Sequence, residues 1–298
     1  MDALIGQTAA LLVALSFSIT SVCYTLAGRK LTAVTSIALS LPASGVLLLL
    51  VHRVTQGVWL PVGASPQRWA VLGISGILAF VISNFFMLKA YQQIGPRLTM
   101  LVASFAPIGG ALLAWLFLGQ ALPANTMLGI AVVTAGVVWV VLERSKVGTA
   151  QPTAERSRGL LFATLGTLTQ SAAFVFATLG VAGAFAPFSA TLIRIIAGVL
   201  ATWAVIVAQG KVAETVGVLR DARMVWLLLG AAVTGPLIAG TLLLVSLQRI
   251  PVGVATTLSH TTSIMLIPIG YVVFKERITL RAVLGTAVAI VGIAILFV

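Results

Sequence analysis

The sequence predicts an all-α integral membrane protein with ten transmembrane helices, arranged as two inverted five-helix repeats around a central cavity. Two observations lead to this fold class. The chain has 298 residues, of which 60% are hydrophobic and only 8% charged, whereas a soluble domain carries about 25% charged residues. The sequence also repeats itself at about half its length, which indicates that two copies of one unit were joined.

The repeat is found by sliding the sequence back by 156 positions, after which long apolar runs and the breaks between them coincide. The matched pairs are Ile94 with Ile250, Trp115 with Tyr271, Gln120 with Glu276, Leu128-Gly129 with Leu284-Gly285, and Gly136 with Gly292. The first helices of the halves align at a shift of 153 positions, Gly6 with Gly159 and Phe17 with Gln170. In a membrane chain, such a repeat is typical of a transporter whose halves face each other across a binding site.

The apolar runs define the helices, because about 20 apolar residues are needed to cross the hydrocarbon of a bilayer. Ten such runs lie near 4–27, 33–51, 69–90, 97–118, 125–142, 159–182, 188–208, 224–246, 252–274 and 281–298. We therefore expect a first repeat over 1–142, a polar linker over 143–158 and a second repeat over 159–298. Since each repeat has an odd number of spans, the second enters the membrane with the opposite orientation.

Composition excludes several classes of function. The net charge of +12 comes from lysines and arginines in short spacers between apolar runs, so we interpret them as membrane-face anchors and expect no nucleic-acid partner. The single cysteine, Cys23, leaves no internal disulfide and no cysteine-based metal site. No Walker motif, metal-ligand cluster or Ser-His-Asp spacing is visible, so we expect no cofactor, no metal and no enzymatic activity.

Short motifs in both halves resemble the EamA-type members of the drug/metabolite transporter superfamily. They are Ser104-Phe105-Ala106-Pro107 and Gly119-Gln120 in the first half, then Ser263, Pro268 and Lys275-Glu276-Arg277 in the second. The resemblance implies a basket of helices with an alternately open central cavity, exporting small metabolites across an inner (plasma) membrane. Two positions depart from the family pattern: Gln120 replaces the usual acidic residue, and Leu15-Ser16-Phe17 replaces a tryptophan-containing start of the first helix.

All six acidic residues lie at the ends of predicted helices or in spacers: Asp2, Glu143, Glu155, Glu214, Asp221 and Glu276. The chain therefore has no carboxylate in the middle of a predicted span. Proton-coupled antiport of lipophilic cations commonly uses such a group, so this mechanism is disfavoured.

Two ionisable residues inside predicted spans are the first candidates for function, because such groups are costly in a bilayer. Arg194 could hold a substrate carboxylate or phosphate through a bidentate contact; alternatively it snorkels to the interface or ties helices together. His260 is the only side chain within the predicted spans that titrates near neutral pH, so it could carry a coupling proton. The alternative is a neutral imidazole bonded to a neighbouring group. Ser263 lies on the same helical face.

Uncharged residues complete the predicted cavity wall. Asn84 and Gln170 are mid-span amides that suit a polar or zwitterionic substrate, or that bond one helix to another. Ser16 and Phe17 share one face of the first helix, and Phe174 follows Gln170 by one turn. These aromatic residues either face the cavity or pack toward lipid.

Prolines and glycines predict movement and packing. The prolines within spans are Pro42, Pro107, Pro236 and Pro268, which act either as hinges for gating or as static kinks. The glycine pairs Gly129/Gly136 and Gly285/Gly292 place small residues on one helix face. We expect them to pack within their own half, with the seam of a homodimer as the alternative, so both a monomer and a homodimer stay open.

The charge distribution and the family resemblance predict opposite orientations of the chain in the membrane. Spacers on the side opposite the termini are rich in lysine and arginine, whereas those on the side of the termini hold only Arg53, Arg68 and Arg249. The positive-inside rule places both termini outside, whereas the family resemblance implies termini inside.

The sequence thus predicts a secondary transporter that exports small amino-acid-like or carboxylate metabolites by alternating access. Its partners are a small-molecule substrate and the lipid bilayer, with or without a coupling proton. The alternatives are a multidrug efflux transporter for lipophilic compounds and, from another class, a non-transporting membrane assembly or sensor subunit.

Overall fold

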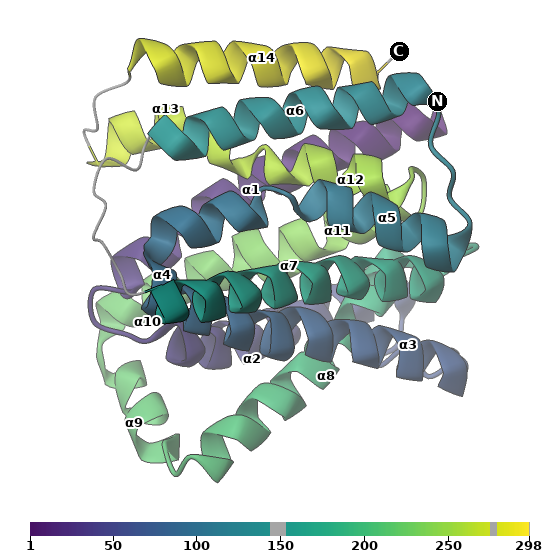
Figure 1. Ribbon diagram of the computed structural model, residues 1–298. Coiled ribbons are helices and arrows are strands. Elements are labelled where there is room, and N and C mark those ends of the chain that lie inside the picture. The colour runs from purple at the N-terminus through teal and green to yellow at the C-terminus, as the bar shows by residue number, and fades with distance from the viewer. Residues whose placement is uncertain (144–152, 275–278, 298) are drawn as a thin grey trace.

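The computed structural model describes residues 1–143, 153–274 and 279–297, and these residues form a bundle of helices without strands. In Figure 1 most helices run across the picture, and both termini lie at its right-hand end. We call this end of the bundle the terminus face. The opposite end, where the first helix leads into the second, is the linker face.

The first half supplies five membrane-spanning segments. Its elements are α1 (Asp2–Ala27), α2 (Ala33–Gln56), α3 (Pro66–Ile77), the π-helical segment η1 (Leu78–Ile82), α4 (Ser83–Ala103), α5 (Ala106–Leu118) and α6 (Ala124–Glu143). The third span, Pro66–Gly95, joins α3, η1 and most of α4. It ends at Gly95, whose φ of 73° turns the chain out of the helix in a conformation that favours glycine.

The second half repeats this order. Its elements are α7 (Thr153–Val181), α8 (Pro187–Ala208), the short α9 (Val212–Gly217) and η2 (Val218–Arg220), α10 (Ala222–Ala232), the π-helical η3 (Val233–Ala239), α11 (Gly240–Leu247), α12 (Val252–His260), α13 (Thr262–Phe274) and α14 (Leu280–Leu296). The span Ala222–Leu247 joins α10, η3 and α11.

The predicted fold class is confirmed. Nine helices of the described residues are long and apolar enough to span a membrane, and a shorter apolar helix, Ala282–Leu296, occupies the place of the tenth. Some predicted bounds differ. The helix α7 begins at Thr153, inside the range expected to be linker, while residues 144–152, 275–278 and 298 lie outside the described part of the chain.

The two halves are interrupted at equivalent positions. Moving η1 forward by 156 residues gives 234–238, which falls within η3 (Val233–Ala239). The break between α4 and α5 at Phe105 moves in the same way to Thr261, which separates α12 from α13. Because π-helical segments often occur at functional sites, their appearance in both halves directs attention to the region between them.

The glycines of α6 and α14 pack against each other across the two halves. A Cβ added to Gly136 would lie 2.6 Å from the backbone nitrogen of Ala289, and one added to Gly292 would lie 2.5 Å from that of Val133. The two helices lie side by side at the top of Figure 1. The prediction that these glycines pack within their own half is therefore wrong. The small residues do permit close backbone approach, as expected in a membrane, but the partner is the equivalent helix of the other repeat.

A second pair of contacts crosses between the halves, one at each face. A Cβ on Gly6 would lie 2.8 Å from Cγ2 of Ile250, and a Cβ on Gly159 would overlap Cγ2 of Ile94. The repeat relates Gly6 to Gly159 and Ile94 to Ile250, so this is one contact made twice. The first helix of each half thus rests on the other half.

We predict that Gly136→Ala lowers the thermal midpoint of the purified protein in detergent. The added methyl group meets backbone atoms of α14 that cannot rotate away, which we expect to cost about 1–3 kcal/mol. Gly63→Ala is the matched control, because nothing lies within 4 Å of its added Cβ. Equal midpoints for both variants would contradict the close approach of α6 and α14.

Candidate functional site

A cavity of about 510 Å³ lies between the two halves and is lined by α1, α2, η1, α4, α7, α8, η3 and α11. Residues that were predicted as substrate contacts or hinges and that do line it are Phe17, Asn84, Gln170, Phe174, Arg194 and Pro236. The two π-helical segments contribute Ala79 and Phe80 on one side, and Gly235 and Pro236 on the other. The cavity therefore lies where the two repeats bulge toward each other.

Among the residues that the structure describes, Arg194 is the only charged one in the wall of this cavity. Its side chain is 3% exposed, and its Nε is buried without a hydrogen-bond partner. No acidic residue of the described chain pairs with it; its Cζ lies 5.9 Å from the centre of the Phe80 ring instead. Because a buried cation is costly unless it is paired, this arrangement favours an anionic group of a ligand as its partner.

Two glycines determine where Arg194 and Phe80 lie. A Cβ on Gly76 of α3 would overlap the carbonyl oxygen of Arg194, so α3 and α8 approach each other at this residue. One turn further along α8, a Cβ on Gly198 would lie 2.6 Å from Cδ2 of Phe80. The absence of side chains at these two positions lets the guanidinium group and the aromatic ring share one part of the wall.

The predicted amides have different surroundings. Asn84 donates from Nδ2 to the carbonyl oxygens of Ala79 and Phe80, each at 3.1 Å, and so supports the bulge of its own helix. The alternative predicted for it, a bond to another helix, is not what the described residues show. Gln170 is half-buried and makes no hydrogen bond to any described residue. Its amide is therefore free to donate and accept in the cavity.

The cavity continues toward the linker face. A second cavity of about 410 Å³ shares Ile37, Phe80 and Asn84 with the first, and extends between Ala33 at the start of α2 and Tyr91 near the end of the third span. Within the described part of the chain, no acidic residue and no histidine lines either cavity.

The terminus face is closed by polar contacts. Gln248 donates from Nε2 to the carbonyl oxygens of Val181, Gly183 and Phe185, at 3.0, 2.6 and 3.1 Å. Nearby, Nη2 of Arg68 donates to the carbonyl oxygen of Ala182 over 3.1 Å. The α7–α8 loop is thus held over the terminus end of the bundle, whereas the two described cavities extend toward the linker face.

Six predicted residues line neither of the two cavities: Ser16, Pro42, Pro107, His260, Ser263 and Pro268. His260 lies at the end of α12, where its Nδ1 is 2.9 Å from the carbonyl oxygen of Thr256. This contact matches the structural alternative for His260. Pro107 begins α5 just after the break at Phe105, whereas Pro42 and Pro268 lie inside helices α2 and α13.

The sequence predicts that His260 is the only histidine within a membrane span, and the structure shows that this prediction is wrong. The helix α2 continues to Gln56, so it includes His52, which is 1% exposed. Its Nδ1 is 2.8 Å from the carbonyl oxygen of Val58, and its Nε2 is 2.9 Å from Oγ of Ser189. His52 thus links α2 to the start of α8 at the closed face. The prediction missed it because the apolar run ends at residue 51.

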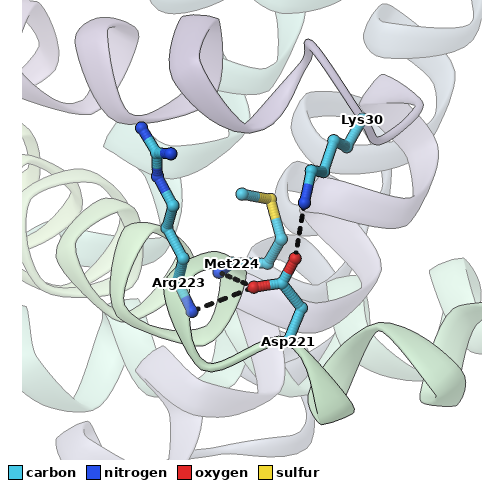
Figure 2. Close-up of polar contacts among 4 residues, drawn as sticks. All are labelled: Lys30, Asp221, Arg223 and Met224. Carbon is cyan, nitrogen blue, oxygen red and sulfur yellow. Dashed lines mark hydrogen bonds and ion pairs between the residues drawn. The ribbon is translucent and has the colours of Figure 1, made fainter.

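An ion pair joins the halves at the linker face (Figure 2). Nζ of Lys30, in the α1–α2 loop, lies 2.8 Å from Oδ2 of Asp221. The other carboxylate oxygen accepts from the backbone nitrogens of Arg223 and Met224, which caps the first turn of α10. The hydrogen bond from Lys30, together with the cap, holds the pKa of Asp221 below its ordinary value of 3.8.

Two opposed sets of membrane-spanning helices around a mainly apolar cavity that contains one buried arginine are typical of membrane transporters. The chain belongs to the EamA-like transporter family, whose model matches residues 4–142 and again 157–298. Its family is consistent with the drug/metabolite transporter superfamily and is one of transporters rather than enzymes.

Comparison with solved structures supports the fold. A structure described as "Crystal structure of protein" is 20% identical over 99% of this chain and 94% of that one, with a TM-score of 0.76. At this identity, the likeness shows the fold alone. The comparison with curated proteins found no match.

We predict that acid weakens the tether between Lys30 and Asp221. Because folding lowers the pKa of Asp221, its contribution to stability is present at neutral pH and is lost as the pH falls through the folded-state value. The effect is small, since the pair is exposed. As the pH is lowered from neutral to about 3, the thermal midpoint should fall less steeply for Asp221→Asn than for the parent protein. Parallel curves would contradict the tether.

We predict opposite outcomes for the two amides of the cavity. Asn84→Leu should lower the thermal midpoint, because Ala79 and Phe80 lose a donor at the bulge, with a cost of about 1–3 kcal/mol. Gln170→Leu should leave the midpoint within about 0.5 kcal/mol of the parent protein, because no described residue depends on its amide. A stability loss for Gln170→Leu as large as for Asn84→Leu would show that its amide has a structural partner.

Proposed function

We propose that the protein is an exporter of small amino-acid-like or other carboxylate metabolites, which it moves across the inner (plasma) membrane by alternating access of the central cavity. The observation on which this rests is the buried, unpaired guanidinium group of Arg194 in the cavity wall. Its planar donors fit a carboxylate through two parallel hydrogen bonds.

The rest of the wall suits the other parts of such a substrate. A volume of about 510 Å³ lies within the usual range for small-molecule sites. Gln170 offers a donor and an acceptor for an amino or hydroxyl group, while Phe17, Phe80 and Phe174 surround an apolar side chain. All these residues belong to one chain, so a monomer is sufficient for binding.

The distribution of charge supports the direction of export. The cavity opens at the linker face, where Arg29, Lys30, Lys211 and Arg220 are exposed. The positive-inside rule places this face in the cytoplasm, so the open cavity is in the state that takes up substrate from inside. The family resemblance implies the opposite orientation. Labelling of an exposed cysteine in intact cells, with Arg29→Cys in a Cys23→Ala background, decides between the two.

We propose facilitated exchange rather than proton coupling. No acidic residue and no histidine lines either described cavity, and His260 bonds to its own helix. A wall without a titratable site near neutral pH gives a proton no place to compete with the substrate.

The test is counterflow of labelled amino acids and related carboxylates in proteoliposomes, with and without a pH gradient. We expect Arg194→Leu to reduce uptake about ten- to hundredfold, the cost of losing a charged hydrogen bond to the ligand. Arg194→Lys should retain part of it, because a point charge replaces the planar fork. The control is Lys211→Leu, which removes an exposed cation outside both cavities.

Two outcomes would overturn the proposal. Movement of lipophilic cations without any carboxylate exchange, indifferent to Arg194→Leu, would identify a multidrug transporter. Uptake that needs the pH gradient and is lost in His260→Ala would replace facilitated exchange with proton coupling.

A further inference from the structure

We propose that Gln248 and Gln92 are two equivalent latches, each of which closes one face of the cavity while the other is released. Gln248 holds the terminus face closed in this structure, and Gln92 closes the linker face in the alternate state. This inference rests on the proposed transport function, because it supplies the contact that exchanges when the cavity changes sides.

The closed face shows how the latch works. Gln248 lies at the end of the span Ala222–Leu247, next to the α7–α8 loop. Its single amide nitrogen contacts three carbonyl oxygens of that loop, those of Val181, Gly183 and Phe185. Backbone carbonyl oxygens in a loop otherwise bond to water. Because the Gln248 side chain takes the place of water at these oxygens, it fixes the loop over the end of the span Ala222–Leu247.

The linker face has an equivalent glutamine and an equivalent loop, but the two are not bonded to each other. Subtracting 156 from 248 gives 92, and Gln92 occupies this position near the end of the third span, Pro66–Gly95. It is exposed and makes no hydrogen bond to any described residue. The loop equivalent to α7–α8 is the α1–α2 loop, residues 28–32, whose residues 28–30 are exposed. Gln92 thus has no partner among the described residues, while the loop is tied to the start of α10 through the ion pair of Lys30 with Asp221 and not through a glutamine.

The residues that precede the two glutamines differ in solvent exposure, as expected if one face is closed and the other open. Leu247 precedes Gln248 and is 3% exposed, whereas its equivalent Tyr91 precedes Gln92 and is 36% exposed. Tyr91 lines the second cavity, which lies between the start of α2 and the end of the third span. The gap that Gln92 would close is therefore present as a cavity in this structure.

One contact beside the glutamines is shared by both faces. Two residues beyond each glutamine, the equivalent isoleucines Ile94 and Ile250 make the same close contact with a glycine of the other half. Because these contacts are alike at both faces, they can persist while the halves exchange conformations, and only the loops and the glutamines need to change partners. An inverted repeat permits this exchange, since each half can adopt the conformation of the other.

The test is the reactivity of engineered cysteines, which needs no substrate. The chain has one cysteine, so Cys23→Ala gives a background without thiols. Leu247→Cys and Tyr91→Cys then report on the terminus and linker faces by their rates of maleimide labelling in detergent. Gln248→Ala should accelerate labelling at position 247 and slow it at position 91, with a change of about tenfold in the ratio of the rates, as expected for the loss of one or two net hydrogen bonds. Gln92→Ala should change the ratio in the opposite direction.

Gln56→Ala is the matched control, because Gln56 is an exposed glutamine at the end of a helix, with no hydrogen bond to the described residues.

Hydrogen exchange gives a second measurement without cysteines: Gln248→Ala should speed exchange in the α7–α8 loop and slow it in residues 28–32. Faster labelling at both positions, or an unchanged ratio in both variants, would overturn the latch. Neither readout uses a carboxylate. Failure to find a carboxylate substrate would therefore not contradict the latch, and failure of the latch would not contradict the proposed substrate.

Discussion

Close backbone contact between equivalent helices of the two repeats is the constraint on which this structure depends. In a bilayer, helices gain little from hiding apolar side chains, so their association needs van der Waals contact at short distance. Gly136 and Gly292 supply it between α6 and α14, and the pairs Gly6–Ile250 and Gly159–Ile94 supply it at the two faces. With the halves joined in this way, the helices between them are free to enclose a cavity.

The same kind of contact places the charged group that gives the cavity its chemistry. Gly76 brings the backbone of α3 against the carbonyl oxygen of Arg194, so the arginine side chain starts from a helix held deep in the bundle. The guanidinium group is buried in the cavity wall, and no acidic residue of the described chain neutralises it. The cost of burying it is reduced when an anion binds, which is the physical basis of the proposed carboxylate substrate.

The sequence predicts this architecture because the signals involved are local: apolar length, the breaks between runs and the 156-residue repeat. Arg194, Asn84 and Gln170 were found for a similar reason, since a polar residue stands out within an apolar run. Phe80 and the π-helical segments give no such signal, because an aromatic residue facing a cavity and one facing lipid look alike in sequence. The partners of the glycines were predicted wrongly since small residues mark a contact surface without naming the helix that covers it.

What the sequence could not predict is the difference between two equivalent segments. Gln92 and Gln248 occupy the same place in the repeat, yet one is exposed and the other bonds three carbonyl oxygens. The two described cavities extend toward the face at which the glutamine is exposed, and the other glutamine holds a loop at the opposite face. The unlike surroundings of the two glutamines are what the proposed exchange between equivalent conformations of the repeats requires.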